Sequence, residues 1–203
     1  MEAEAELRRA DLASDPLEQF RSWFAEAAAA VEVPEAVALA TATPGGAPSV
    51  RMVLLKGFDE RGLVFYSHQG SRKGRELEAN PQAALLFHWS PLGRQVRVEG
   101  RVERVSEAES DAYFATRARG AQLGALASRQ SEPLGSRSEL EERLAEVESE
   151  LGEGPVPRPA TWGGFRLVPT AWEFWQHRAS RLHDRFRYEP DPPGGWRIDR
   201  LFP

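Results

Sequence analysis

Short strand-like segments separated by tight turn signals dominate the first half of this chain. They are rich in apolar and β-branched side chains, and Pro44-Gly45-Gly46 and Pro91-Leu92-Gly93 fill two of the gaps. Connections this short join antiparallel neighbours, because a parallel crossover needs a dozen residues or more. The segments are residues 37–43, 49–56, 63–67, 82–89 and 95–105. Such a run of strands predicts an antiparallel barrel.

Helix signals flank these strands. Asp15-Pro16-Leu17-Glu18 has the composition of a helix start, and Ser106 opens a second capping pattern. Further helices are expected over a short segment ending at Asn80-Pro81 and over residues 120–129 and 138–151. Four C-terminal strands are expected to complete the barrel, at residues 162–168, 171–176, 182–188 and 196–200. The predicted fold class is α+β with a mainly antiparallel sheet.

Length and charge limit the classes of protein that fit. A chain of 203 residues is most simply one domain, here residues 15–203 after a flexible N-terminal segment over residues 1–14. The net charge of −5 comes from interspersed charges and gives no footprint for nucleic acid or an anionic membrane. No cysteine, signal peptide or membrane-spanning stretch is present, which predicts a soluble cytoplasmic protein without disulfides or thiol chemistry.

A cationic stretch near the C-terminus is the most distinctive chemical motif. In an extended strand, Arg181, His183 and Arg185 would share one face, while Leu182 and Asp184 point the other way. Guanidinium groups bind phosphate bidentately and also lie flat on conjugated rings, so this face suits a flat anionic ligand. The alternative is a solvated edge strand with ordinary surface charges.

A second candidate anion site lies where a strand passes into a helix. The stretch from Ser67 to Lys73 turns at Gly70 and places Arg72 and Lys73 in the first helical turn. Free amides at a helix N-terminus attract anions, and first-turn cations oppose the helix dipole unless an anion is present. The alternative is a capped surface helix with incidental basic residues.

Other polar residues extend these two sites. Arg51 and Lys56 stand at an odd separation, which puts them on opposite faces of a regular strand, so they would serve different phosphates unless a bulge intervenes. Their alternative is two charges snorkelling from a buried strand. Tyr113 and Arg117 are four residues apart on the helix expected after Ser106, hence on one face. The alternative for this pair is a surface Tyr-Arg stack.

Together, these motifs strongly resemble the pyridoxine/pyridoxamine 5'-phosphate oxidase family, from about Asp11 to Pro203. The matching motifs are Arg51-Met-Val-Leu-Leu-Lys56, Tyr66-Ser67, Ser71-Arg72-Lys73, Gln95-Val96, Tyr113-Phe114, Arg117, Gln130-Ser131, Glu173-Phe174-Trp175-Gln176 and Arg181-Leu-His-Asp-Arg185. Members are homodimers with a split β-barrel, and they bind flavin mononucleotide (FMN) in clefts at the subunit interface. They oxidise pyridoxamine or pyridoxine 5'-phosphate to pyridoxal 5'-phosphate, with dioxygen reduced to hydrogen peroxide.

The resemblance implies roles for individual residues. Those implied for FMN are Arg51, Met52, Val53, Leu54, Leu55, Lys56, Tyr66, Ser67, Arg72, Lys73, Gln95, Gln130, Ser131, Trp175 and Arg185, some of them supplied by the partner subunit. Those implied for the substrate are Lys56, Tyr113 and Arg117 at its phosphate, and Arg181, Leu182 and His183 at its ring. Arg181 and His183 are the catalytic candidates, and of these only His183 can exchange a proton near neutral pH. No metal site is predicted, because the histidines do not cluster with carboxylates.

Three departures from the family pattern bear on substrate choice. Ala121 replaces a serine that usually contacts the substrate phosphate, His177 replaces a glycine, and Arg8-Arg9 lacks the usual following lid segment. The alternatives are therefore a related flavin oxidase or reductase acting on another aromatic compound, as in phenazine biosynthesis, or a non-catalytic flavin or pyridoxal phosphate carrier. The sequence leaves open the preference between amine and alcohol substrates and any second pyridoxal phosphate site.

Overall fold

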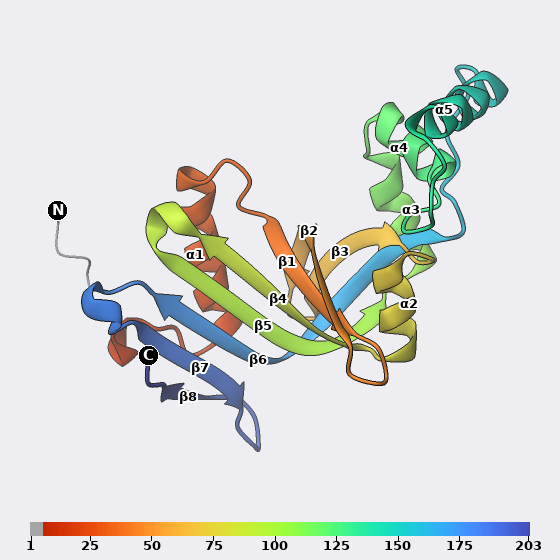
Figure 1. Ribbon diagram of the computed structural model, residues 1–203. Helices are drawn as coiled ribbons and strands as arrows, with labels where there is room; N and C mark the ends of the chain where they lie inside the picture. The colour runs from red at the N-terminus through yellow and green to blue at the C-terminus, as the bar shows by residue number, and fades with distance from the viewer. Residues whose placement is uncertain (1–5) are drawn as a thin grey trace.

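The computed structural model describes residues 6–203, which form one antiparallel sheet with helices at its two ends (Figure 1). The strands are β1 (Ala36–Ala42), β2 (Pro48–Asp59), β3 (Gly62–His68), β4 (Gln82–Trp89), β5 (Arg94–Arg104), β6 (Trp162–Gln176), β7 (Asp184–Pro190) and β8 (Trp196–Arg200). The helices are α1 (Pro16–Ala30), α2 (Arg72–Ala79), α3 (Glu107–Ala115), α4 (Arg119–Ala127) and α5 (Arg137–Leu151). The α+β class predicted above is confirmed.

Six strands close into a barrel. The sheet order is β3-β2-β1-β4-β5-β6-β7-β8, and β3 also pairs with β6, which closes the ring. Of the C-terminal strands, only β6 therefore completes the barrel, whereas β7 and β8 extend the sheet beyond it. The expectation that all the C-terminal strands complete the barrel is corrected on this point.

A continuous β6 replaces the two strands expected on either side of Pro169. Proline lacks the N–H that a central strand needs, and this suggested a break. The structure accommodates it with a β-bulge, because the pairing with β5 shifts between Glu99 and Gly100 and leaves Thr170 without a Cα partner. The strand therefore runs without interruption from Trp162 to Gln176.

The barrel interior is filled by apolar side chains that alternate with outward-facing residues along each strand. In β1, Val37 and Leu39 are fully buried, whereas the alanines that alternate with them are only partly buried. Helix α1 covers one end of the barrel, and its Phe20 ring lies 5.0 Å from the ring of Phe87 and 5.4 Å from that of Trp172. Asp15 caps α1 by accepting a hydrogen bond from the backbone N–H of Leu17, 2.7 Å away.

The described part of the N-terminal segment packs against this same end. Leu7 and Leu12 are buried in the core, and the backbone N–H of Leu7 donates to Asp184 at 3.1 Å. The hydroxyl of Tyr188 donates to the carbonyl of Ala13 at 2.8 Å. Residues 1–5 of the segment expected to be flexible lie outside the described residues, but specific contacts with the barrel begin by Leu7.

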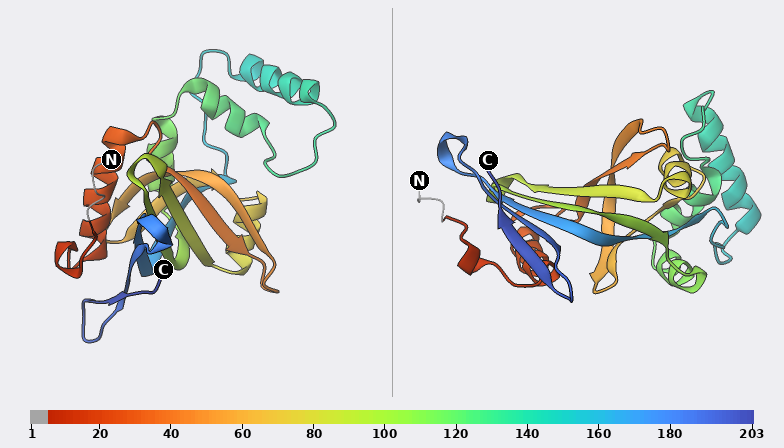
Figure 2. Two further views of the ribbon diagram at one scale, coloured as in Figure 1. Left: turned by 60° about the vertical axis from the view of Figure 1, so that its left-hand side comes forward. Right: turned by 90° about the horizontal axis from the view of Figure 1, so that it is seen from below.

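Helices α3, α4 and α5 gather at the opposite end, and α5 projects away from the barrel (Figure 2). None of the helices in residues 6–203 has both the length and the apolar character needed to cross a membrane.

Candidate active site

A cleft of about 960 Å³ opens between the barrel and helices α2, α3 and α4. This volume is in the range of small-molecule and cofactor sites. The predicted residues that line it are Arg51, Met52, Val53, Leu54, Lys56, Tyr66, Ser67, Arg72, Lys73, Tyr113, Arg117, Gln130 and Ser131. Residues far apart in the sequence are thus brought together around one space.

The start of α2 supplies the cationic part of the cleft. Ser71 caps the helix, and Lys73 turns back under it to donate to the hydroxyls of Ser67 at 3.0 Å and Ser71 at 3.2 Å. Its ammonium also donates to the side-chain oxygen of Gln130 at 2.8 Å. Burial, with a smaller contribution from Arg51, lowers the pKa of Lys73 to about 8.

Lys73 meets neutral partners only, as far as the described residues show. No carboxylate among residues 6–203 forms an ion pair with it, although its side chain is buried. A buried charge without a counter-charge is costly, and a bound anion would supply one. The environment of Lys73 therefore fits a phosphate group.

Three parallel rings form the wall opposite. The centroids of Tyr66 and Tyr113 are 3.9 Å apart, and Trp162 stacks 5.5 Å from Tyr66. The guanidinium of Arg117 lies 4.7 Å from the centroid of the Trp162 ring. Nη1 of Arg117 is buried and has no hydrogen-bond partner among the described residues. Burial also lowers the pKa of the Arg117 guanidinium. An unpaired buried donor beside aromatic rings fits a second anionic group.

Arg117 lies at this wall, but it is not on helix α3 as expected. Helix α3 ends at Ala115, so Arg117 lies beyond it, where its backbone N–H donates to the carbonyl of Phe114 at 3.1 Å. The expectation of one helical face with Tyr113 is wrong, because the helix stops two residues early. Both side chains nevertheless line the same cleft.

The strand residues Arg51 and Lys56 both line the cleft, and a β-bulge lies at Lys56, where the pairing of β2 with β3 shifts between Leu55 and Gly57. Side chains of β2 alternate, with Arg51 on the partly buried side and Lys56 on the exposed side. Leu55 differs from its neighbours, because it belongs to the hydrophobic core and does not line the cleft. The resemblance places the backbone of residues 51–56 beside the cofactor, and for Leu55 this stays a prediction, while its side chain packs in the core.

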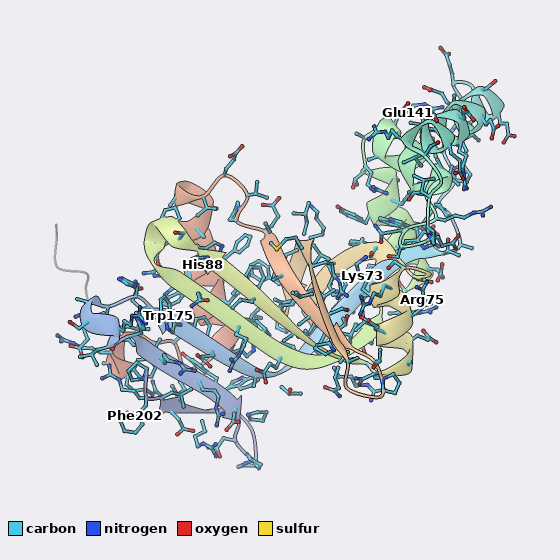
Figure 3. All side chains as sticks on the ribbon, viewed as in Figure 1. Lys73, Arg75, His88, Glu141, Trp175 and Phe202 are labelled. Carbon is cyan, nitrogen blue, oxygen red and sulfur yellow. The ribbon has the colours of Figure 1, made fainter. Side chains whose placement is uncertain are left out.

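The remaining predicted residues form a second group around β6 and β7. Gln95 pairs with Trp175, and Trp175 pairs with Arg185 across the sheet. The ring of His183 lies 4.5 Å from that of Trp175. Figure 3 shows Trp175 and Lys73 on opposite sides of the molecule, and none of the second group lines the cleft. One copy of the chain therefore holds the predicted site in two separated halves.

The shared strand face expected for Arg181, His183 and Arg185 is wrong. Strand β7 begins only at Asp184, and Ser180 and Arg181 have positive φ angles of 57° and 61°. This left-handed turn places Arg181 and Leu182 on an exposed loop rather than on a strand. The backbone N–H of Arg178 donates to Nδ1 of His183 at 3.1 Å, so a neutral His183 carries its proton on Nε2.

His177, which stands where the family has glycine, lies beside this loop. Its ring is 5.2 Å from that of His183 and 6.1 Å from that of Trp175. The side chain is exposed. It therefore borders the group that the resemblance assigns to the substrate ring.

Among the cleft-lining residues that sequence reasoning did not assign to the site, Trp162 and His68 matter most for its chemistry. Trp162 belongs to the aromatic wall, and His68 follows Ser67 directly at the end of β3. Burial, and to a lesser degree Lys73, lowers the pKa of His68. A signal for Trp162 was present, since this aromatic residue opens the strand expected after the Pro-rich connection. Its stacking, however, depends on the β3–β6 pairing that closes the barrel.

The described residues contain no group of three or more His, Asp or Glu side chains arranged to hold a metal ion. Cations, hydroxyls and aromatic rings are among the side chains that line the cleft.

Comparisons with known proteins give a consistent result. Residues 24–150 match the family described as pyridoxamine 5'-phosphate oxidase, and residues 162–203 match the pyridoxine 5'-phosphate oxidase C-terminal dimerisation region. The pyridoxine/pyridoxamine 5'-phosphate oxidase of Rubrobacter xylanophilus is 61% identical, over 98% of this chain and 94% of that protein. That of Gluconobacter oxydans is 58% identical, over 95% of this chain and 96% of that protein.

A solved structure shares the whole fold. PhzG from Burkholderia lata 383, determined in complex with tetrahydrophenazine-1-carboxylic acid, superposes with a TM-score of 0.91 at 35% identity and covers 99% of both chains.

Proposed function

Because this chain belongs to the pyridoxine/pyridoxamine 5'-phosphate oxidase family, we propose that it oxidises pyridoxamine or pyridoxine 5'-phosphate to pyridoxal 5'-phosphate with FMN as cofactor. The observation that carries the proposal is the cleft, which combines one buried cation without a counter-charge, one unpaired arginine nitrogen and a stacked aromatic wall. These features suit two phosphorylated, ring-containing ligands side by side.

The FMN phosphate would lie at the start of α2. Lys73 and Arg72 supply positive charge there, and the hydroxyl of Ser67 already contacts Lys73 at 3.0 Å. The side chain of Arg72 is 59% exposed, which leaves its terminal nitrogens accessible from the cleft. When bound, FMN would accept the hydride removed from the substrate carbon and pass its electrons to dioxygen.

The substrate phosphate would lie near Arg117. The partnerless Nη1 of Arg117 and the hydroxyl of Tyr113 are the donors on this side, with Lys56 facing them from β2. Ala121 also lines this part of the cleft and offers no hydroxyl.

The second half of each site would come from another copy of the chain. Residues 162–203, which match a dimerisation region, contain β6, β7 and the loop that bears Arg181 and His183. An exposed apolar band beside the cleft supports this arrangement: Val50 is 68% exposed, Met52 63% and Leu54 43%. Met52 pairs with Ala38 and Ala38 with Leu86, so the band continues across β1 to β4.

In this homodimer, the partner chain would supply residues to both the flavin and the substrate parts of each active site. Arg185 and Trp175 would complete the flavin site, and Arg181 and His183 would close over the substrate ring. His183 presents its Nε2–H as a hydrogen-bond donor that can orient the substrate, because its Nδ1 already accepts from the backbone N–H of Arg178. Arg181 stays protonated and contributes charge and orientation. Closure by the partner would also exclude bulk water from the reacting carbon.

The test is direct. The purified protein, supplied with FMN and air, should convert pyridoxamine 5'-phosphate, dioxygen and water to the aldehyde, ammonia and hydrogen peroxide in equal amounts. Pyridoxine 5'-phosphate should give aldehyde and peroxide alone. Apoprotein that cannot be reconstituted with FMN would refute the flavin site.

A second candidate is oxidation of another aromatic compound, which the close superposition with PhzG favours. In that case the protein would bind FMN and remain inert toward both vitamin phosphates. The same assay thus separates the two functions.

A further inference from the structure

Glu76 is a buried carboxylate that joins two of the arginines beside the cleft. Its side chain is 6% exposed, on the side of α2 that faces β1 and β2. Oε1 accepts from Nε of Arg72 at 2.8 Å, and Oε2 lies 3.2 Å from Nη2 of Arg51. The hydroxyls of Thr41 and Ser49 also donate to Oε2.

These donors keep Glu76 charged. Burial opposes its ionisation, but hydrogen bonds from Ser49, Thr41, Arg72 and Arg51 together lower its pKa to about 2. Glu76 is therefore an anion at any pH at which the protein functions, fixed by partners from β1, β2 and α2.

The way in which Glu76 holds Arg72 leaves that arginine ready for a ligand. Only Nε of Arg72 is used by the carboxylate, and neither terminal nitrogen has a hydrogen-bond partner among the described residues. A guanidinium fixed through Nε presents both terminal nitrogens in one direction, which is the geometry for bidentate phosphate binding. Arg51 is held differently, because both of its terminal nitrogens already have partners. Nη1 donates to the carbonyl of Leu39 at 3.1 Å and to the hydroxyl of Thr41 at 2.6 Å, and Nη2 donates to the hydroxyl of Ser49 and to Glu76.

We propose that Glu76 is a positioning residue for the cofactor phosphate: before the ligand arrives, it orients Arg72 with both terminal nitrogens available and fixes the charge of Arg51 beside it. The inference rests on the proposed function, because it takes the FMN phosphate to be the anion that these arginines receive. Glu76 itself does not touch the ligand; it acts through the two guanidinium groups.

Simple electrostatics predicts the opposite effect, and this makes the proposal testable. A carboxylate near a phosphate dianion repels it, so removing the charge would tighten binding if repulsion dominated. If orientation dominates, removing the charge frees Arg72 to adopt other rotamers, and phosphate binding then weakens.

The experiment compares Glu76→Gln with Glu78→Gln in apoprotein. Glu78 lies on the same helix but is exposed and pairs with Arg104 at 2.6 Å, away from the cleft. Flavin fluorescence quenching gives the dissociation constants of FMN and of riboflavin, which lacks the phosphate. Glu76→Gln should weaken FMN binding by about tenfold or more, a change on the scale of one lost charge-assisted contact. Riboflavin binding should be unchanged, and Glu78→Gln should resemble wild type for both ligands.

The outcomes separate the possible failures. Equal or tighter FMN binding by Glu76→Gln would overturn the positioning role, and an equal loss of FMN and riboflavin affinity would assign Glu76 a purely structural role. Wild-type protein that binds neither ligand would refute the proposed function itself. If Glu76→Gln does not fold, Ser49→Ala replaces it, since it removes one hydroxyl donor to Glu76; FMN binding unchanged in that variant would overturn the proposal.

Discussion

Lys73 carries its ammonium into a site where, among the described residues, hydroxyl and amide oxygens are its hydrogen-bond partners. Its pKa of about 8 means that the apoprotein loses this positive charge just above physiological pH. A bound phosphate would favour the protonated form, so binding above pH 8 must take up a proton. Nearby His68 is neutral in this range because burial and Lys73 lower its pKa.

We therefore expect the FMN dissociation constant to be level between pH 7 and the Lys73 pKa, and then to rise. The limiting slope is about tenfold per pH unit for one proton taken up. Titrations of apoprotein with FMN at several pH values measure it. Lys73→Arg should remove the inflection, because guanidinium stays charged. An inflection of the same size in that variant would assign the titration to another group.

Ala121 offers a second test at the scale of single residues. Ala121→Ser restores a hydroxyl at the position where the family usually has one, on the wall of the cleft beside Arg117. One added hydrogen bond is worth about 1 kcal/mol, so KM for the vitamin phosphate should fall several-fold with kcat nearly unchanged. Ala125→Ser, which lies on the same wall, is the control. Equal effects of the two substitutions would argue against a specific contact at position 121.

At the scale of elements, the bulge in β6 depends on a close approach at Gly100. A Cβ added there would collide with the carbonyl oxygen of Val168 and press on Pro169. Gly100→Ala should therefore reduce the free energy of unfolding by about 1–3 kcal/mol. Urea denaturation measures it, with Gly57→Ala as the control, since no neighbouring atom lies within 4 Å of a Cβ at that position. Equal stabilities of the two variants would show that the sheet relaxes around the bulge.

How far the elements could be predicted depended on whether their signals were local. Turn residues and apolar alternation located β1 to β5, and the Asp15 cap located α1, because these signals lie within a few residues of the element. Pro169 suggested that the strand ends there, but a bulge keeps β6 continuous past the proline. This bulge depends on Gly100, which belongs to another strand. Positive φ angles usually occur at glycine, but the residues with positive φ here are Ser180 and Arg181. The sequence therefore contained no sign of a turn, and the alternating charged residues over 181–185 were mistaken for a strand.

The site was predictable as a set of residues but not as an arrangement. The cationic character of the cleft at Arg72 and Lys73 could be inferred from their place at a helix start, and phosphate binding there stays a prediction. The separation of Trp175 and Arg185 from the cleft depends on how the barrel closes, which no local pattern encodes. Likewise, the Glu76 cluster joins three elements through side chains that look unremarkable in the sequence.

For the whole molecule, the two half-sites predict complementation between defective subunits. Arg72→Ala with Lys73→Ala disables the cleft, whereas Arg185→Ala disables the β6–β7 half. Each homodimer should be inactive. Random mixing of the two inactive chains should restore about a quarter of wild-type activity, because half of the dimers then contain one intact site of two.

Mixed subunits are obtained by co-expression with two different affinity tags, and activity is measured on the doubly tagged dimer. Its expected activity is half that of wild type. A doubly tagged dimer as inactive as its parents would show that each site is built within a single chain.

Strand β6 begins with Trp162 in the aromatic wall and continues as far as Trp175 in the other group. In the proposed dimer, strand β6 therefore extends from the active site of its own chain to the second active site, which it helps to complete. A displacement of β6 at one site would therefore reach the other site along continuous backbone, through the bulge at Pro169.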